Sequence, residues 1–169
     1  SMDVAAVFQR LIELPVISAR LNIAAAEEGP LNEADCMRLS ALAFLHDIGK
    51  LHPGFQAKGW PPSLWRGPTR GHLSEGWDFL QLSLRRPEHP FHATMLQIMD
   101  WGSNAVAPLI SAIFAHHGRP VTAQGQATLR DWPTLPQYDW LDEARAMDAA
   151  LHLWFAPAFG PVERTLPSE

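Results

Sequence analysis

The stretch NEADCMRLSALAFLHDIGK, residues 32–50, decides the fold class. Apolar side chains recur in it every three or four residues, the spacing of one face of an α-helix, at Met37, Ala41, Leu45 and Ile48. Asn32 is a suitable N-cap, and Gly49 is typical of a helix end. We therefore expect a helix that begins near residue 32 and ends with a polar His-Asp pair just before Gly49.

The same spacing predicts helices in five other stretches, over residues 3–14, 73–84, 91–101, 104–117 and 139–155. Asp3 is a candidate N-cap for the first, and Pro15 interrupts it. Residues 51–70 contain four prolines and three glycines, which predicts a loop, and residues 121–137 are rich in turn formers. Because no strand or repeat pattern is recognisable, the expected fold is all-α, a compact helical bundle.

Composition limits the class of protein. A chain of 169 residues with 47% hydrophobic content is expected to form one domain over residues 1–169. The single cysteine, Cys36, suits a reducing compartment, and no leader or membrane-spanning run is recognisable, so a soluble cytoplasmic protein is expected. Ser1 before Met2 resembles a residue left by tag removal, so the natural start is open.

Two polar pairs end strongly apolar helical stretches: His46-Asp47 and His116-His117. A helix carboxyl end carries partial negative charge and favours a cation, while imidazole and carboxylate suit transition metals, and a carboxylate can bridge two ions. A single histidine in such a place is more often a cap or packing residue, but the repeated arrangement favours a metal site. His72, just before another predicted helix, is a further candidate ligand.

The segment from Ile48 to Ser74 has no acidic residue, although the net charge of the chain is -5. It combines basic and aromatic side chains that suit single-stranded nucleic acid, chiefly Lys58, Arg66, Arg70, Trp60 and Trp65, with Phe55 as another stacking candidate. Lys50 lies beside the His-Asp pair and suits contact with a phosphate oxygen. The alternative for this segment is a solvated loop with its tryptophans folded onto the domain.

These residues also carry a resemblance. The motif His46-Asp47, with His72 and then His116-His117, resembles the HD superfamily of metal-dependent phosphohydrolases. The longer strings LHDIGK (residues 45–50), PGFQAK (53–58) and HHGRP (116–120) look like the HD nuclease domain of the CRISPR-associated nuclease-helicase of type I systems. The resemblance runs from about residue 3 to residue 167.

The resemblance implies a helical nuclease domain that cleaves single-stranded DNA with one or two divalent transition-metal ions: manganese, nickel, cobalt or iron. It implies partnership with a helicase domain, in the same chain or another, and with the RNA-guided surveillance complex. Asp47 would bridge the ions, His46 would bind the first ion, and three histidines would bind the second: His72, His116 and His117. Lys50 would act with Asp47 at the scissile phosphate.

The chain departs from the family pattern at both ends. The family has a further histidine on its first helix and a later aspartate beyond a segment resembling residues 155–167, and neither has a counterpart here. We therefore expect a truncated piece of a larger nuclease-helicase, with at most one firmly held metal and weak activity. Two alternatives stay open: an HD phosphohydrolase of nucleotides or small phosphate esters, and a non-catalytic HD interaction module.

Overall fold

The computed structural model describes residues 2–25, 29–118 and 132–167. Its helices and helical turns are α1 (Met2–Ile12), α2 (Pro15–Ala24), α3 (Glu33–Phe44), η1 (Leu45–Leu51), α4 (Pro53–Gln56), η2 (Ala57–Gly59), α5 (Leu73–Arg85), α6 (His92–Asp100), α7 (Ser103–Phe114), α8 (Trp140–Trp154) and η4 (Ala156–Phe159). Across these ranges the β structure is limited to an isolated bridge between Leu135 and Tyr138. The expected all-α fold is confirmed.

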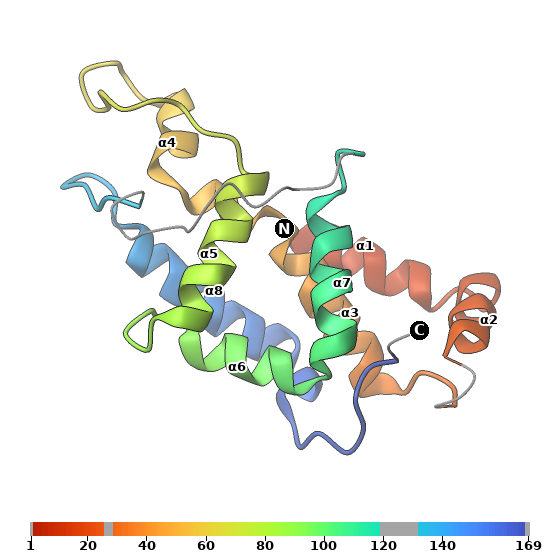
Figure 1. Cartoon of the computed structure of the whole chain (residues 1–169). Helices are drawn as coiled ribbons and strands as arrows, with labels where there is room; N and C mark the ends of the chain where they lie inside the picture. The colour runs from red at the N-terminus through yellow and green to blue at the C-terminus, as the bar shows by residue number, and fades with distance from the viewer. Residues whose placement is uncertain (1, 26–28, 119–131, 168–169) are drawn as a thin grey trace.

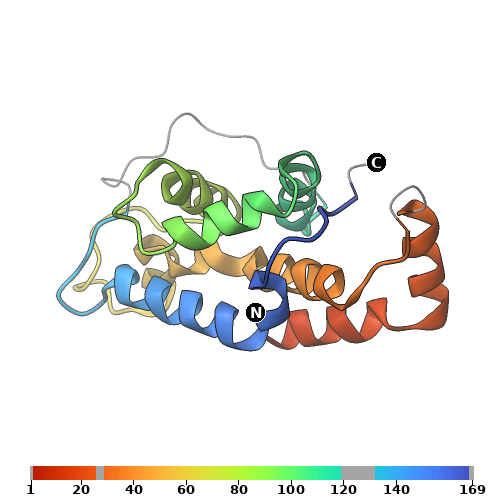
Figure 2. The ribbon, with the colours of Figure 1, turned by 90° about the horizontal axis from the view of Figure 1, so that it is seen from below.

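The segment that begins at residue 33 and continues through η1 runs through the middle of the bundle. Figure 2 shows α5, α6 and α7 on one side of it, and α8 and α1 on the other. Contacts of α5 and α8 with η1, and of α1, α7 and η4 with α3, place this segment at the centre. In the described part of the chain, no helix is long and apolar enough to cross a membrane.

The start of α3 behaves as its sequence predicts. The backbone N–H of Asp35 donates to Asn32 Oδ1 at 2.9 Å, and the backbone N–H of Asn32 donates to Asp35 Oδ2 at 3.0 Å, which forms a reciprocal capping box. Asp35 also pairs with Arg38, whose Nη1 lies 3.4 Å from Asp35 Oδ1, and with Arg164 of the C-terminal segment. This network fastens the last described residues to α3.

Several predicted boundaries are wrong. The α-helix ends at Phe44, and residues 45–51 continue as a 3₁₀-helix, so the His-Asp pair lies in a tighter turn than expected. Part of the predicted loop is helical, because His52 Nδ1 accepts a hydrogen bond from the Gly54 N–H and so caps α4. Proline at the first helical position is compatible with that start.

The N-terminal region also differs from the prediction. Asp3 lies inside α1 rather than capping it, and a second helix, α2, begins directly at Pro15. Proline was taken as an interruption, whereas here it occupies the first turn of a helix, where its missing N–H costs nothing. Helix α7 ends at Phe114, so the histidine pair lies in the turn that follows it. Residues 119–131 lie outside the described residues, and with them most of the predicted turn-rich stretch, residues 121–137.

Candidate metal centre

A close crossing of glycines brings the site elements together. A Cβ built on Gly49 of η1 would lie 1.9 Å from the His72 carbonyl oxygen and 2.3 Å from the Gly76 backbone nitrogen. A Cβ on Gly76 would lie 2.5 Å from a ring atom of Phe114, at the end of α7. Only hydrogen atoms fit at these two positions. The crossing therefore sets the carboxyl end of α7 and the start of α5 against η1.

At this crossing, His46 and Asp47 face each other. His46 Nε2 lies 3.0 Å from Asp47 Oδ2, and both side chains are close to nine-tenths buried. His46 Nδ1 lies 2.8 Å from the Ala43 carbonyl oxygen. Since a carbonyl only accepts, Nδ1 carries the proton, and in the neutral ring Nε2 is an acceptor. Two acceptors thus face one another, an arrangement that a cation between them would stabilise.

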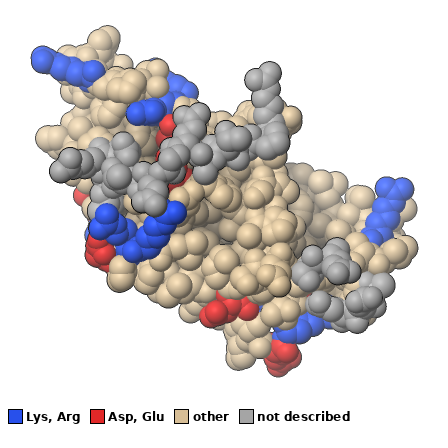
Figure 3. Space-filling view, viewed as in Figure 1, with Lys and Arg blue, Asp and Glu red and all other residues tan. Residues whose placement is uncertain are grey.

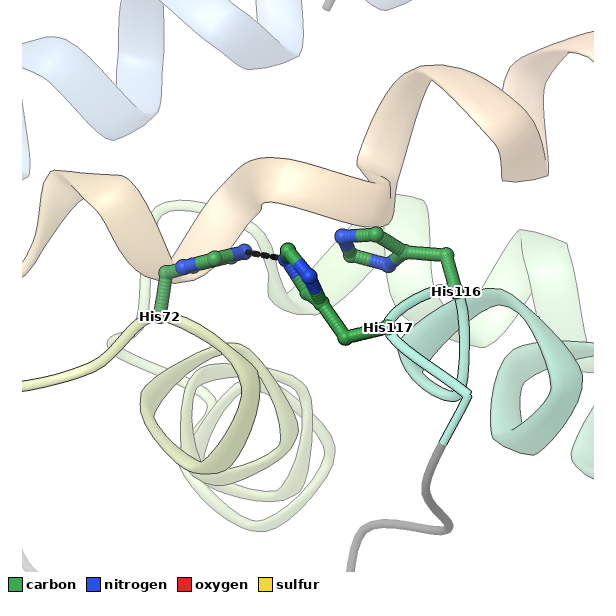
Figure 4. A group of neighbouring side chains, drawn as sticks. All are labelled: His72, His116 and His117. Carbon is green, nitrogen blue, oxygen red and sulfur yellow. Dashed lines mark hydrogen bonds between the residues drawn. The ribbon is translucent and has the colours of Figure 1, made fainter.

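The other carboxylate oxygen faces the second histidine group. Asp47 Oδ1 lies 3.4 Å from His72 Nε2, which in turn lies 3.3 Å from His117 Nε2. Figure 4 shows the rings of His72, His116 and His117 close together, the first from the start of α5 and the pair from the turn after α7. The rings of His116 and His117 are 4.4 Å apart, and those of His72 and His116 are 5.6 Å apart.

His116 belongs to both groups. It lies with His72 and His117, and also with His46 and Asp47, in sets whose ligand atoms are all within 4.8 Å of one another. Its Nδ1 lies 2.7 Å from the Ile113 carbonyl oxygen and therefore donates a hydrogen bond to it. Only Nε2 is then left to bind a metal. The five predicted metal ligands thus converge, as two overlapping sets of three.

Electrostatics keep the ligands in the protonation states that a metal needs. Burial lowers the pKa of His46 and of His72 below the ordinary histidine value, so both rings are neutral near pH 7. Burial alone would raise the pKa of Asp47, but the hydrogen bond from Lys50 and the neighbouring positive charges lower it below its usual value. A neutral imidazole and an ionised carboxylate are the ligand forms of these residues.

The residues present fit a divalent transition metal. Four imidazoles and one carboxylate form a mixed nitrogen and oxygen set that suits manganese, iron, cobalt, nickel or zinc. The backbone hydrogen bonds to Nδ1 of His46 and His116 hold these rings with Nε2 toward the centre, which is the usual support of a metal-binding histidine. His116 and His117 are exposed, so the centre opens to solvent on one side.

Lysines and an aromatic ring border the centre. Lys50 Nζ lies 2.6 Å from Asp47 Oδ2 and 6.0 Å from the centre of the Phe55 ring. The Lys58 Nζ lies 4.4 Å from the centre of the same ring, within cation–π range. The Phe55 ring also meets His72 edge-on, at 5.6 Å. Phe55 therefore links the predicted phosphate contact, Lys50, to the exposed charge of Lys58.

The other predicted DNA-binding residues lie farther along this segment. Arg66 and Arg70 are exposed, and Figure 3 shows basic side chains over α4 and the chain that follows it. The two tryptophans are partly buried and make internal contacts: Trp60 meets the Tyr138 ring at 5.5 Å, and Trp65 Nε1 donates to the Pro68 carbonyl oxygen. Arg66 and Arg70 are thus exposed to solvent, whereas the two tryptophans are partly engaged by the protein.

Sequence reasoning missed Gly76, which positions the site without touching a metal. Its signal was a glycine inside a predicted helix, a place where glycine is unfavourable unless something approaches closely. Gly49 was noticed only as a helix end, whereas its main role is the contact with the backbone of α5.

Comparison with known proteins gives one match. The family model described as "Cas3, HD domain" matches residues 1–168, almost the whole chain. No curated protein and no solved structure matches.

Proposed function

The chain belongs to the Cas3 HD-domain family of CRISPR-associated, metal-dependent nucleases, and on that premise we propose that it hydrolyses phosphodiester bonds of single-stranded DNA in CRISPR interference. The proposed ligands of its divalent transition metal are His46, Asp47, His72, His116 and His117. The observation that carries the proposal is the convergence of these side chains, in which four imidazoles surround a carboxylate and His46 Nε2 lies 3.0 Å from Asp47 Oδ2.

When bound, the metal would lower the pKa of a water molecule toward neutrality and neutralise charge on the phosphate oxygens. The protein's own groups hold and orient the reacting parts. The two oxygens of Asp47 face different histidines, so the carboxylate that belongs to the set with His46 and His116 also contacts His72 of the other set. Lys50, with a side chain 43% exposed at the edge of the centre, can leave Asp47 and donate to an oxygen of the scissile phosphate.

The strand would approach from the solvent side and run past Phe55. Lys58, Arg66 and Arg70 are exposed and would contact phosphates that flank the scissile one. Trp60 and Trp65 would offer their outer faces for base stacking, since their other contacts are internal. We propose further that the domain acts with a helicase domain, which supplies the single strand, and with the RNA-guided surveillance complex, because these are partners of the family.

The open side of the centre favours a polymer over a nucleotide. A phosphohydrolase of small esters would be expected to enclose its substrate, whereas two of the histidines here are exposed. Circular single-stranded DNA and bis(p-nitrophenyl) phosphate therefore form a diagnostic pair of substrates.

The test is cleavage of circular single-stranded DNA with manganese or nickel, using the wild-type chain and Asp47→Ala, with Asp142→Ala on the surface of α8 as the matched control. Metal-dependent cleavage lost only in Asp47→Ala supports the proposal. Hydrolysis of the small ester or of nucleotides without cleavage of DNA would favour the small-substrate phosphohydrolase. Metal binding without any hydrolysis would favour an interaction module.

The basic segment has its own test. Lys58→Ala should weaken binding of a labelled oligonucleotide by about threefold to tenfold, because one phosphate contact is lost, and should reduce the salt dependence of binding by about one ion. Hydrolysis of bis(p-nitrophenyl) phosphate should not change. An equal loss on both substrates would place Lys58 in the metal centre rather than along the strand.

A further inference from the structure

Residues 55–69, which we call the basic loop, leave the domain and return to it at the same place. The backbone N–H of Arg70 donates to the Gly54 carbonyl oxygen at 3.0 Å, and a Cβ on Gly54 would lie 2.7 Å from Arg70 Cγ. Figure 1 shows this part of the chain projecting beyond the helices beside α4. The loop carries Lys58 and Arg66, two of the proposed phosphate contacts. A loop closed in this way depends on side-chain contacts to keep its shape.

The two tryptophans of the basic loop make different contacts. Trp65 folds back within the loop: its Nε1 donates to the Pro68 carbonyl oxygen at 3.2 Å, and a Cβ on Gly67 would lie 2.5 Å from its ring. Trp60 instead meets a residue far away in the sequence, Tyr138, with the ring centres 5.5 Å apart. Trp65 therefore shapes the loop, whereas Trp60 leans on the rest of the domain.

The support for the loop is a tight turn at the start of α8. Leu135 and Tyr138 exchange two backbone hydrogen bonds, each 3.0 Å long. The next residue, Asp139, caps α8 with its side chain, so the turn is fixed to that helix. A second contact from this turn reaches the loop, because Gln137 Nε2 donates to the Leu64 carbonyl oxygen at 3.0 Å.

Tyr138 also contacts the element that carries the metal ligands. Its hydroxyl donates to the carbonyl oxygen of Leu51 at 2.8 Å, and Leu51 is the last residue of η1, which contains His46 and Asp47. Burial raises the pKa of Tyr138 above its ordinary value, so the hydroxyl keeps the proton that it donates. One side chain thus touches both η1 and Trp60 of the basic loop.

We propose that Tyr138 is a positioning residue for the DNA strand: its ring supports Trp60, and so holds the cations of the basic loop at a fixed place relative to the metal centre. The inference rests on the function proposed above and adds the residue that sets the path of the strand. The physical reason is preorganisation, because a loop already held in its binding position does not have to be ordered when the strand binds.

The test compares two substitutions of the same residue. Tyr138→Leu removes the ring beside Trp60, and should weaken binding of a labelled single-stranded oligonucleotide about threefold to tenfold. The KM for DNA cleavage should rise by a similar factor, and this loss should exceed any loss on bis(p-nitrophenyl) phosphate at least threefold. Tyr138→Phe keeps the ring and should restore most of the binding. Circular dichroism confirms that both variants are folded.

Limited proteolysis provides a measurement that needs no activity. Trypsin cleaves after lysine and arginine, and the basic loop offers Lys58 and Arg66, each followed by a glycine. If Tyr138 holds the loop, Tyr138→Leu should be cut at these two sites at least threefold faster than the wild-type chain, because the loop opens more often. Tyr138→Phe should be cut at nearly the wild-type rate.

The outcomes separate this inference from the proposed function. Weaker DNA binding and faster loop cleavage in Tyr138→Leu, both restored in Tyr138→Phe, support the positioning role. Wild-type DNA binding in Tyr138→Leu, or equal losses on DNA and on the small ester, would overturn it while the nuclease function stands. Equal losses in the two variants would assign the effect to the hydroxyl and also overturn the role of the ring. If the wild-type chain neither binds nor cleaves single-stranded DNA, the proposed function fails, and the inference fails with it.

Discussion

Two charged clusters lie near opposite ends of the central segment formed by α3 and η1, and they are built on opposite rules. At the start of α3, the buried carboxylate of Asp35 meets the guanidinium groups of Arg38 and Arg164, and also accepts the backbone N–H of Asn32. Asp35 and Arg38 are at most 2% exposed. In this cluster both oxygens of the buried carboxylate meet donors of the protein, so its acceptors are complete within the protein, although the buried Arg38 Nε has no hydrogen-bond partner.

At η1 the balance between hydrogen-bond donors and acceptors is different. One carboxylate and four imidazoles converge here. His46 and His116 donate from Nδ1 to backbone carbonyl oxygens, so their Nε2 atoms are left as acceptors. The acceptors outnumber the donors, with Lys50 as the one ammonium paired with the carboxylate. The comparison indicates that the cluster at Asp35, whose acceptors are satisfied within the protein, serves stability, whereas the surplus of acceptors at η1 suits the divalent metal that HD domains bind.

The largest expected effect comes from breaking the complete cluster. Asp35→Ala leaves Arg38 buried without its charge partner and also removes the capping box of α3, so the free energy of unfolding should fall by about 3–5 kcal/mol. Urea denaturation measures this, with the exposed Glu33→Ala on the same helix turn as the control. Metal affinity of the folded fraction should not change. A loss of metal affinity equal to the loss of stability would show that the two clusters are coupled.

The second effect comes from filling the incomplete cluster. Metal at one hundred times its dissociation constant should stabilise the folded protein by about 2.7 kcal/mol, because the ligand set is assembled only on folding. Thermal unfolding with and without nickel measures the shift. Asp47→Asn should lose this shift, yet without metal its stability should stay within about 1 kcal/mol of the wild type. A large loss of stability in the metal-free variant would mean that Asp47 is structural.

The sequence predicted the helical class, the N-cap at Asn32 and the set of side chains that converge, because these depend on local periodicity and on residue chemistry. It did not predict that η1 would be a 3₁₀-helix. It also did not predict that α2 would begin at Pro15, because a proline is compatible with the start of a helix as well as with the end of one, and the local pattern does not distinguish the two.

The geometry inside the site depended on contacts between distant segments. The overlap of the two ligand sets at His116, and the approach of Gly49 to Gly76, join residues that lie far apart in the sequence. Lys50 and Asp47 lie three residues apart, so their ion pair is a local contact. The same position of Lys50 also suits a contact with a phosphate oxygen, and that contact was the one predicted. The residues that come together were thus predictable from residue types, whereas their division into two overlapping sets required the fold.

The smallest of the three effects tests a histidine that belongs to neither cluster. His89 is 5% exposed, and burial lowers its pKa from 6.5 to about 4. Its Nδ1 accepts the Phe91 N–H, and its Nε2 has no hydrogen-bond partner. Because the unfolded chain binds the proton more readily, the stability that His89 contributes is full above pH 6.5 and is lost as the pH falls toward 4.

At about pH 5.5 the loss from His89 should be about 1.4 kcal/mol relative to neutral pH. His89→Asn keeps an acceptor for the Phe91 N–H and removes the titrating ring, so it should lose less stability than the wild type between about pH 7.5 and 5.5 in metal-free urea denaturation. The exposed His117→Asn is the matched control. The lowered pKa values of His46 and His72 act in the same direction, so some acid sensitivity should persist in His89→Asn. If His89→Asn retained the full acid sensitivity of the wild type, the metal-free histidine cluster would be its source, and the surplus of acceptors at η1 would carry a cost in stability as well as a capacity to bind metal.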